Sequence, residues 1–443
     1  MKKRVLFINV RSHMVERMEP LFAAKNLNVD PVLLCDKDPE IDDRYVNPDN
    51  VFIADTYDMD KALEIVKEIH QKNPVSGVLT WADKDVELVS RIAAALGLPG
   101  PSIEASKNAR NKYLMRSAIA LKHPELCPRF KSVRSLEELQ TAVDEIGVPG
   151  VLKPVGASGS KSIIKIFDNH DLYSAYHEVV KETRIDRDPV YNYFPDQYIY
   201  EELMDGDEIS IEGFVSTFDN NIIIAGMTDK FVTDKYSTEY KEFEPSQKNP
   251  EYLRVYREQI TKAIRALGIS QCSFHAECKV NGPQLKVIEI AARPGGEFIT
   301  THLVPLASGI SFVEQNIKNA LGLPIDTQIE FAQWSQSPKC IAGHLDFMSN
   351  QEGIVTHIGG LQRIYEDPNV VNFLPLKEEG DSIVLPPDDF SSLYTATMVV
   401  KGTSIEDIEK SFDLIQQRSE ISISKEAIKY NASSHYVYQY DWQ

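Results

Sequence analysis

The sequence predicts a fold that combines α/β and α+β parts, and three observations support this prediction. Strand-like and helix-like segments alternate through residues 5–96, which is typical of a parallel sheet with helices on both faces. Pairs of short strands joined by turns follow between residues 150 and 290, which is typical of antiparallel sheet. Strand and helix signals alternate again over residues 343–443. We therefore expect a doubly wound N-terminal domain, an antiparallel middle part and a C-terminal α+β domain.

The N-terminal part shows the alternation most clearly. Its expected strands are Val5–Val10, Pro31–Cys35 and Val75–Thr80. Its expected helices are Met14–Lys25, Asp58–Gln71 and Asp85–Leu96. Sheets of this kind bind ligands at the carboxyl ends of their strands, but no G-x-G-x-x-G fingerprint of a dinucleotide site follows the first strand. The breaker-rich segment Gly97–Ser102 marks the end of this part.

The charge composition argues against two classes of partner, nucleic acids and anionic membranes. The 443 residues carry 47 Lys and Arg against 66 Asp and Glu, a formal net charge of −19. A broad surface for nucleic acid or for an anionic membrane needs the opposite balance, so we expect neither partner. A local basic cleft for a small anion remains compatible with this total.

Neither export nor a thiolate metal site is expected. The five cysteines form an odd number and include no C-x-x-C pair, which disfavours zinc and a disulfide framework. The basic start Met1–Arg4 precedes an apolar stretch that is too short for a signal peptide, and no stretch approaches the length of a membrane span. We expect a cytoplasmic protein with reduced thiols.

A strand, a loop of small residues and a second strand are expected over residues 151–166. Lys153 lies at the end of the first strand. The small residues of the loop are Gly156, Ser158, Gly159 and Ser160. Isoleucines after the loop favour a strand, whereas a P-loop opens a helix. Backbone N–H groups of such a loop, together with the Lys153 ammonium, could meet phosphates; the alternative is a surface hairpin with a snorkelling lysine.

Three other segments have simpler expected structures. Ser106–Ile119 is expected to form one helix. Tyr198–Val215 is expected to form a half-exposed hairpin, because acidic and apolar residues alternate on both sides of a turn at Asp205–Gly206. Lys230–Pro250 is expected to be a long polar loop, and loops of this length often act as lids or linkers.

A hairpin with a carboxylate on each strand is expected over residues 273–291. A three-residue loop would place Glu277 opposite Glu289, with Cβ atoms about 4.5–5.5 Å apart, whereas a loop of even length would separate them onto opposite faces. Two like charges on one face need a cation, and oxygen ligands suggest Mg²⁺ or Mn²⁺. Arg293 continues the alternation of Glu289, and His275 is expected to be structural.

In chain order these segments resemble the ATP-grasp superfamily of carboxylate–amine ligases, over roughly half of the chain. The matching motifs are Leu96–Gly100, Asn111-Lys112-x-x-Met115-Arg116, Lys153 with its loop, Glu201-Glu202-Leu203, Glu208, Glu277, and Glu289 with Arg293. The resemblance implies an ATP-grasp fold with three domains. These are an N-terminal domain at 1–105, an ATP-grasp domain at 106–325 with a small lid at about 128–200, and a C-terminal α+β domain at 326–443.

The resemblance also implies how ATP would bind. Lys112 and Lys153 would contact its phosphates, and the loop Gly156–Ser160 would close over them. Residues 201–203 would be the hinge that meets adenine, although the match at Glu201 and Glu202 could slip by one residue. Glu208 would bind the ribose hydroxyls.

The same resemblance implies the metal site and the catalytic group. Glu277 and Glu289 would bind Mg²⁺ or Mn²⁺, and Arg293 would stabilise an acyl phosphate and the tetrahedral intermediate. Many members carry an Asn ligand where this chain has Ala291, so the number of metal ions stays open.

Within the superfamily, Phe274–Glu277 and Ala292–Gly296 look most like the bacterial L-amino-acid ligases, dipeptide synthetases of peptide-antibiotic pathways. This likeness implies that the chain joins amino acids through an acyl phosphate and releases ADP and phosphate; a homodimer is one option for its assembly. Two alternatives remain. One is an ATP-grasp enzyme of purine or carboxyphosphate chemistry, and the other is a nucleotide-binding regulator without turnover.

Overall fold

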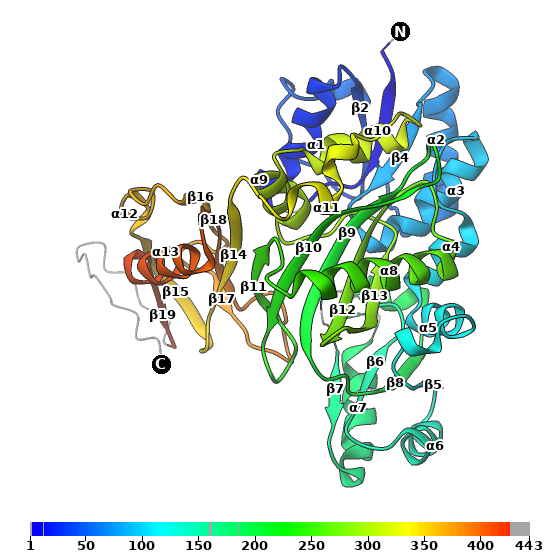
Figure 1. Ribbon diagram of the computed structural model, residues 1–443, viewed down its shortest axis with the longest axis vertical. Helices are drawn as coiled ribbons and strands as arrows, with labels where there is room; N and C mark the ends of the chain where they lie inside the picture. Colours follow the sequence, from blue (N-terminus) through cyan, green and yellow to red (C-terminus); the bar gives the residue numbers. More distant parts are fainter. Residues whose placement is uncertain (1, 12, 158, 160–161, 185, 426–443) are drawn as a thin grey trace.

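The computed structural model describes residues 2–11, 13–157, 159, 162–184 and 186–425. These residues build an N-terminal α/β part, a long central sheet, a small lid and a C-terminal sheet (Figure 1). The predicted fold class, α/β combined with α+β, is confirmed.

Four parallel strands form the N-terminal sheet in the order β3-β2-β1-β4. They are β1 (Arg4–Ile8), β2 (Asp30–Cys35), β3 (Val51–Ile53) and β4 (Gly77–Thr80). Helices α2 (Met59–Lys72) and α3 (Val86–Leu96) pack on one face of this sheet. The opposite face is covered by α1 (Met14–Asn26) and by α10 (Phe312–Ala320), so a helix from much later in the chain completes the doubly wound arrangement.

Eight antiparallel strands form the central sheet in the order β13-β12-β9-β10-β11-β14-β18-β16. Their bounds are β9 (Asp207–Val215), β10 (Ile222–Val232), β11 (Glu239–Glu244), β12 (Ser273–Asn281), β13 (Gln284–Ala291), β14 (Ile341–Met348), β16 (Val370–Pro375) and β18 (Tyr394–Gly402). Helix α8 (Pro250–Leu267) packs its apolar side on β9, β10, β12 and β13. Because side chains alternate along a strand, the other face of these strands is free to carry polar groups.

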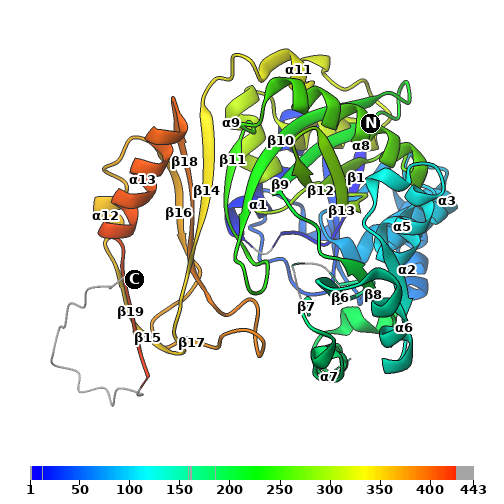
Figure 2. The ribbon, with the colours of Figure 1, turned by 60° about the horizontal axis from the view of Figure 1, so that its bottom comes forward.

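A four-stranded sheet in the order β5-β8-β6-β7 lies beneath the central sheet in Figure 2, and we keep the name lid for this small sheet and its helices. Its strands are β5 (Phe130–Val133), β6 (Gly150–Pro154), β7 (Ile164–Ile166) and β8 (Tyr198–Glu202). Helices α6 (Leu136–Ile146) and α7 (Leu172–Glu182) pack on this sheet. Strands β6 and β7 pair antiparallel on either side of the glycine loop, as the sequence predicted.

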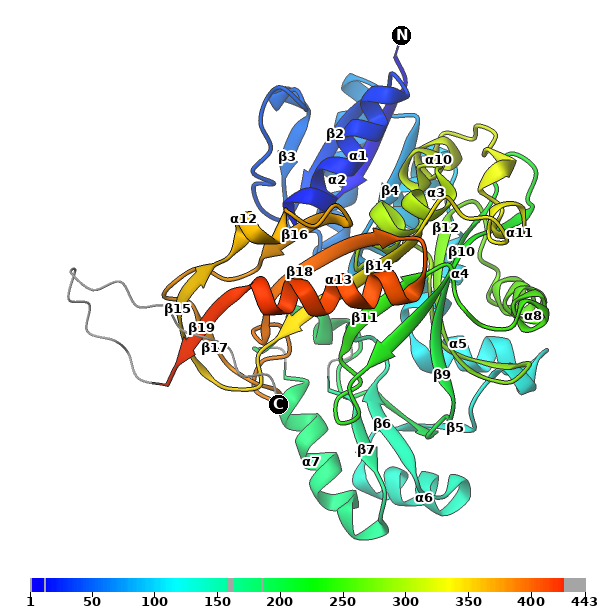
Figure 3. The same ribbon diagram turned by 60° about the vertical axis from the view of Figure 1, so that its left-hand side comes forward.

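The last part of the chain contributes to two sheets. Strands β14, β16 and β18 extend the central sheet, and helix α13 (Ile405–Arg418) packs on β14 and β18 (Figure 3). A smaller sheet contains β15 (Gly353–Gly359), β17 (Ser382–Ile383) and β19 (Glu420–Ser424). Strands beyond residue 325 thus complete a sheet that begins before it. The division into domains at residues 105 and 325 stays a proposal.

The prediction of a single helix over Ser106–Ile119 is wrong. This part of the chain forms two helices, α4 (Ile103–Arg110) and α5 (Lys112–Ala120). Asn111 separates them, because its side chain accepts hydrogen bonds from the backbone of the first turn of α5 and caps it. The remaining short helices are α9 (Val304–Ser308), α11 (Phe331–Trp334) and α12 (Leu361–Ile364). None of the described helices is both long enough and apolar enough to cross a membrane.

Two further expectations are corrected. Tyr198–Val215 is not a hairpin, because β8 pairs within the lid while β9 pairs within the central sheet. Lys230–Pro250 is not a loop: it contains the end of β10 and all of β11, which pairs with β10 and β14. Buried charged residues on β11 hide the apolar alternation that marks a strand.

Candidate active site

A cavity of about 460 Å³ lies between the lid, the central sheet and the carboxyl edge of the N-terminal sheet. Arg11 follows β1 at this edge, and Asp83 and Lys84 follow β4. The strand order reverses between β1 and β4, which is where open α/β sheets hold ligands. The predicted site residues that line the cavity are Lys112, Lys153, Gly159, Glu201, Glu202, Leu203, Glu208, Glu277, Glu289 and Arg293.

A row of charged residues crosses five strands of the central sheet on its cavity side. In cross-strand register the row reads Lys279, Glu208, Lys230, Glu242 and His344. The last four of these are buried. Basic and acidic side chains alternate, so each charge has an opposite charge beside it in the sheet.

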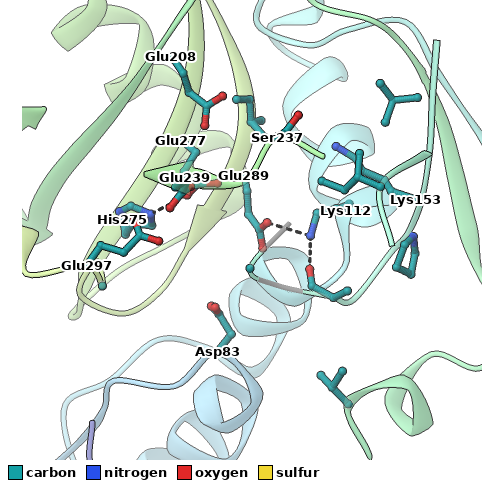
Figure 4. A pocket seen from close by; sticks show the side chains of 18 of the residues that line it. Asp83, Lys112, Lys153, Glu208, Ser237, Glu239, His275, Glu277, Glu289 and Glu297 are labelled. Carbon is teal, nitrogen blue, oxygen red and sulfur yellow. Dashed lines mark hydrogen bonds and ion pairs between the residues drawn. The ribbon is translucent and has the colours of Figure 1, made fainter. Parts of the chain in front are cut away.

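Two buried lysines lie on the lid side of the cavity (Figure 4). The Lys153 ammonium is 2.7 Å from a carboxylate oxygen of Glu201. Lys112, at the start of α5, is 2.8 Å from Glu289. Burial lowers the pKa of Lys153, against the opposing charge of Glu201. Both ammonium groups therefore lie beside the glycine loop, where they could form charged hydrogen bonds with an anionic ligand.

The described residues of the glycine loop contact other parts of the site. A Cβ atom on Gly156 would lie 2.3 Å from the ring of Phe194, so this position packs against the lid. The carbonyl of Ala157 accepts a hydrogen bond from Lys112. Gly159 lines the cavity with a φ of +69°, a conformation that favours glycine. Two predicted loop residues lie outside the described part of the chain: Ser158 and Ser160.

The predicted hinge, residues 201–203, runs along the cavity wall. The Glu202 carboxylate is 2.8 Å from Arg129 and also accepts from Lys286. Glu208 lies farther along the wall and is buried, and burial raises the pKa of its carboxyl. The contact of this hinge with adenine stays a prediction.

Glu201→Gln is expected to destabilise the fold by about 3–5 kcal/mol, because it leaves two buried cations without a counter-charge. Glu201 lies 2.7 Å from both Arg116 and Lys153, and all three side chains are buried. Burial opposes the ionisation of Glu201, yet the charges of Arg116 and Lys153 keep its pKa below the ordinary value. The matched control is Glu202→Gln, because the side chain of its partner Arg129 is 64% exposed. This substitution should lower the free energy of unfolding by about 1 kcal/mol or less. Urea unfolding of both variants measures this difference, and equal losses would contradict the buried ion-pair account.

The two predicted metal-binding strands meet through an irregular register. Asn281 pairs with Gln284, so the loop between β12 and β13 has two residues, which is the even-length alternative. An even loop alone would put Glu277 and Glu289 on opposite faces. A β-bulge at Ile288 adds one residue to β13 and brings the two carboxylates opposite each other. The carboxylates therefore face each other as a three-residue loop would have placed them, although the loop is even and the bulge restores the register.

The two carboxylates nevertheless have different partners. Glu289 pairs with Lys112, whereas a carboxylate oxygen of Glu277 lies 2.9 Å from the Lys230 ammonium and 3.3 Å from Nε2 of His275. Burial alone would raise the pKa of Glu277, but Lys230 and His275 hold it well below its usual value. Glu277 is therefore an anion that faces the cavity.

His275 connects Glu277 to the loop after β13. Its Nδ1 bonds to a carboxylate oxygen of Glu212, and the other oxygen of Glu212 accepts from the backbone N–H of Gly295 at 3.0 Å. Burial opposes the charge on the ring, but Glu212 and Glu277 raise the pKa of His275 to about 10. The imidazolium therefore holds Glu277 in place, which agrees with the expected structural role.

Two sets of carboxylates bring their oxygens within 4.8 Å of one another, close enough to share a cation. The sets are Glu208, Glu239 and Glu277, and Glu239, Glu242 and Glu297. Oxygen ligands of this kind suit Mg²⁺. The predicted ligand Glu277 belongs to the first set, while Glu289 belongs to neither and lies against Lys112. Binding of metal by Glu277 and Glu289 stays a prediction.

Arg293 is held beside the N-terminal sheet. Its guanidinium bonds to the Asp83 carboxylate and donates to the carbonyl of Pro294 at 2.7 Å. Burial opposes the ionisation of Asp83, but Arg293 holds its pKa at about 2. Arg11 donates to the carbonyl of Gly295, so two guanidiniums converge on this loop. Such a pair can bind a carboxylate or an acyl phosphate.

Several cavity residues were not singled out from the sequence. They are Arg11, Asp83, Lys84, Glu239 and Glu297, and behind them Lys230, which pairs with Glu277. The first three directly follow parallel strands, so the rule that ligands bind at strand ends was the available signal. Lys230 and Glu239 were assigned to a loop, but Lys230 lies on β10 within a run of buried residues and Glu239 lies at the start of β11.

Known proteins resemble this chain along most of its length. An ATP-grasp domain model matches residues 146–302, and an ATP-grasp N-terminal domain model matches residues 21–100. The alanine–anticapsin ligase of Bacillus subtilis is 25% identical over 410 residues, which cover 85% of this chain and 84% of that protein. A solved L-amino acid ligase from Bacillus licheniformis superposes with a TM-score of 0.78 at 22% identity and covers 96% of this chain and 99% of its own. A solved phosphoribosylglycinamide synthetase from Anaerococcus prevotii gives 0.69 at 19% identity and covers 96% and 100%.

Proposed function

The chain belongs to the ATP-grasp superfamily of carboxylate–amine ligases, and we propose that it joins two amino acids through an amide bond while converting ATP to ADP and phosphate. The observation that carries the proposal is a cavity lined by buried lysines, several carboxylates and Arg293. The relationship to the alanine–anticapsin ligase, whose name states an amino acid as substrate, supports this substrate class.

The lysines serve the first half of the reaction. A carboxylate acylates an amine only after one of its oxygens has become a good leaving group, and phosphorylation achieves this. Lys112 and Lys153 would neutralise the phosphate oxygens during this transfer. Glu289 and Glu201 hold these lysines in position through their ion pairs. Backbone N–H groups of the glycine loop would approach the same oxygens.

The carboxylates on the central sheet supply the metal ligands of the proposal. A bound Mg²⁺ would add charge neutralisation and polarise a phosphoryl oxygen. Glu277 and Glu289 are the proposed ligands, and Glu239 could join Glu277, since the carboxylates of Glu208, Glu239 and Glu277 lie within 4.8 Å of one another. Lys230 and His275 orient Glu277 towards this position.

Arg293 serves the second half of the reaction. When the amine attacks the acyl phosphate, negative charge develops on the carbonyl oxygen, and a guanidinium can donate to it. Asp83 fixes the orientation of Arg293. Enclosure by the lid would exclude water, which would otherwise hydrolyse the acyl phosphate.

A purine-type or carboxyphosphate ligase is the second candidate. The similarity of fold to the phosphoribosylglycinamide synthetase, with a TM-score of 0.69, favours it over other chemistries. It would activate bicarbonate or formate, or act on a ribonucleotide.

A screen for ADP release tests the proposal. The protein is incubated with ATP, Mg²⁺ and pairs of amino acids, and the product mass is measured alongside ADP. We expect ADP to appear only with a carboxylate donor and an amine acceptor present, at one ADP per amide. Stimulation by bicarbonate or formate, with no response to any amino acids, would favour the second candidate. ATP binding without any turnover would favour a regulator.

A further inference from the structure

A buried carboxylate on the N-terminal helix α1 reaches the loop that follows Arg293. It belongs to Glu16, in the first turn of the helix, and its side chain is only 3% exposed. The other buried residues of α1 are Pro20, Leu21, Ala23 and Ala24. Glu16 is therefore the one charged residue among the buried positions of this helix. Because a carboxylate is costly to bury, its contacts should show what it does there.

The contacts of Glu16 converge on one distant segment. Its Oε1 accepts hydrogen bonds from the backbone N–H of Phe298 at 3.3 Å and from the hydroxyl of Thr301 at 3.1 Å. The same oxygen lies 3.8 Å from Nε of Arg11. Arg11 in turn donates to the carbonyl of Gly295. Glu16 therefore holds residues 295–301 directly at one end and through Arg11 at the other.

The backbone of this segment needs support from outside. Glu297 and Phe298 have φ angles of +53° and +62°, in the left-handed region. Neither residue is glycine, and such a conformation persists only where the surrounding structure holds it. A π-helical turn over Ile299–Leu303 follows at once, and the carbonyl of Phe298 accepts from the backbone N–H of His302 at 2.8 Å. Glu16 binds the N–H of the same Phe298, so it fixes the left-handed pair where it enters the helical turn.

The position of this segment bears on the Arg293 guanidinium. That guanidinium donates to the carbonyl of Pro294 at 2.7 Å, so it is held by the loop that it begins. A Cβ atom on Gly296 would lie 3.2 Å from Nη1 of Arg11, which shows how closely Arg11 packs on the same loop. Donors to a transition state act only within narrow limits of distance and angle. A loop that relaxes away from Glu16 would therefore move Arg293 out of line.

We propose that Glu16 is a positioning residue for amide formation: it holds the left-handed turn at residues 297–298 and so keeps Arg293 aligned with the acyl group. This inference rests on the proposed function, in which Arg293 is the donor during amine attack. Without the Glu16 carboxylate the phosphate-binding lysines are untouched, so the acyl phosphate still forms. Amine attack slows, and water instead cleaves the acyl phosphate to the free carboxylate and phosphate. ADP is then released without an amide product.

Hydrogen exchange tests the positioning without requiring turnover. The full chain is transferred to D₂O, and mass spectrometry follows a peptide that covers residues 294–303, with a peptide from α8 as the internal reference. Glu16→Leu removes the acceptor, so amides of the first peptide should exchange about tenfold or more faster while those of α8 do not change. Glu16→Gln keeps an acceptor oxygen and should stay close to wild type. The matched control, Glu19→Gln, changes a partly exposed glutamate on the same helix and should have no effect.

Product analysis of the same variants tests the effect on the reaction. Wild type, Glu16→Gln and Glu19→Gln should release one ADP per amide. Glu16→Leu should release more than one ADP per amide and form amide about tenfold or more slowly, while its affinity for ATP stays unchanged. A contact that only stabilised the fold would lower the amount of active protein, but it would leave the ratio of ADP to amide at one.

The outcomes separate this inference from the ligase proposal. Unchanged exchange over residues 294–303 in Glu16→Leu overturns the positioning role, even if amino acids drive ADP release. Faster exchange with a ratio that stays at one also overturns it. If Glu16→Leu does not fold, Thr301→Val removes one of the two donors to Glu16, and it should raise both the exchange rate and the ratio. Failure of wild type to release ADP with any amino acids, while exchange responds as expected, contradicts the ligase proposal instead.

Discussion

Arg293→Lys should lower kcat by about 10²–10³-fold while the affinity for ATP changes little. A lysine keeps the charge but loses the planar pair of donors that can meet an acyl phosphate and the oxyanion formed on amine attack. Steady-state kinetics with ATP and the amino-acid pair, together with calorimetry of ATP binding, measure the two quantities separately.

The competing role for Arg293 is to brace Glu289. The ion pairs argue against it, because Glu289 pairs with Lys112 and Arg293 pairs with Asp83. As a brace, Arg293 would mainly support Mg²⁺ binding, so excess Mg²⁺ would restore the rate of the variant. If Arg293 instead donates hydrogen bonds to the reacting groups, excess Mg²⁺ should not restore the rate. Asp83→Asn should show a smaller loss of kcat, since it frees the guanidinium without removing it. Rescue of Arg293→Lys by Mg²⁺ would refute the donor role.

Glu277→Gln should reduce kcat/KM by on the order of 10²-fold or more and raise the Mg²⁺ concentration needed for half-maximal rate. The substitution keeps the shape of the side chain but removes the charge that Glu277 shares with Lys230, His275 and the proposed metal. Mg²⁺ titration of the rate, beside circular dichroism to confirm folding, measures the effect. Glu251→Gln on the exposed surface of α8 serves as the matched control. Wild-type dependence on Mg²⁺ in the Glu277 variant would remove this residue from the metal site.

Segments with a regular apolar period were predicted closely. The helix expected over Asp58–Gln71 is observed at Met59–Lys72, and the helix expected over Asp85–Leu96 is observed at Val86–Leu96. In both helices one face is buried and the other is more exposed, so the 3.6-residue period is visible in the sequence. The same signal fails at Asn111, where a side-chain cap breaks a continuous pattern into two helices.

Strands that bury charge could not be predicted in this way. Glu242 and Glu244 are almost fully buried on β11, so the segment appears polar throughout and was assigned to a loop. Cross-strand partners such as Lys230 and His344 explain how these charges are accommodated, but they lie far apart in the sequence. A strand of this kind becomes visible only when its neighbours in the sheet are known.

The residues of the candidate site likewise fall into those that a local sequence pattern reveals and those that it does not. Lys112, Lys153, Glu277 and Glu289 stand in recognisable order along one stretch of chain, and the structure brings them to one cavity. Asp83 and Arg11 come from another part of the fold and carry no local motif. Even the pairing of Glu277 with Glu289 depended on a bulge that the sequence did not reveal. Local order thus predicted the residues that one stretch of chain supplies, while contacts between distant stretches required the structure.

The central claim is that a carboxylate is activated by phosphorylation in the cavity that holds Lys112, Lys153 and Arg293. The most direct measurement uses an amino-acid donor labelled with ¹⁸O in its carboxylate, with ATP, Mg²⁺ and an amine acceptor. Mass spectrometry then determines the isotope content of the released phosphate. Because the acyl phosphate loses one carboxylate oxygen to phosphate when the amine attacks, the account predicts one ¹⁸O per phosphate and one amide product per ADP. Amide formation with unlabelled phosphate would contradict it.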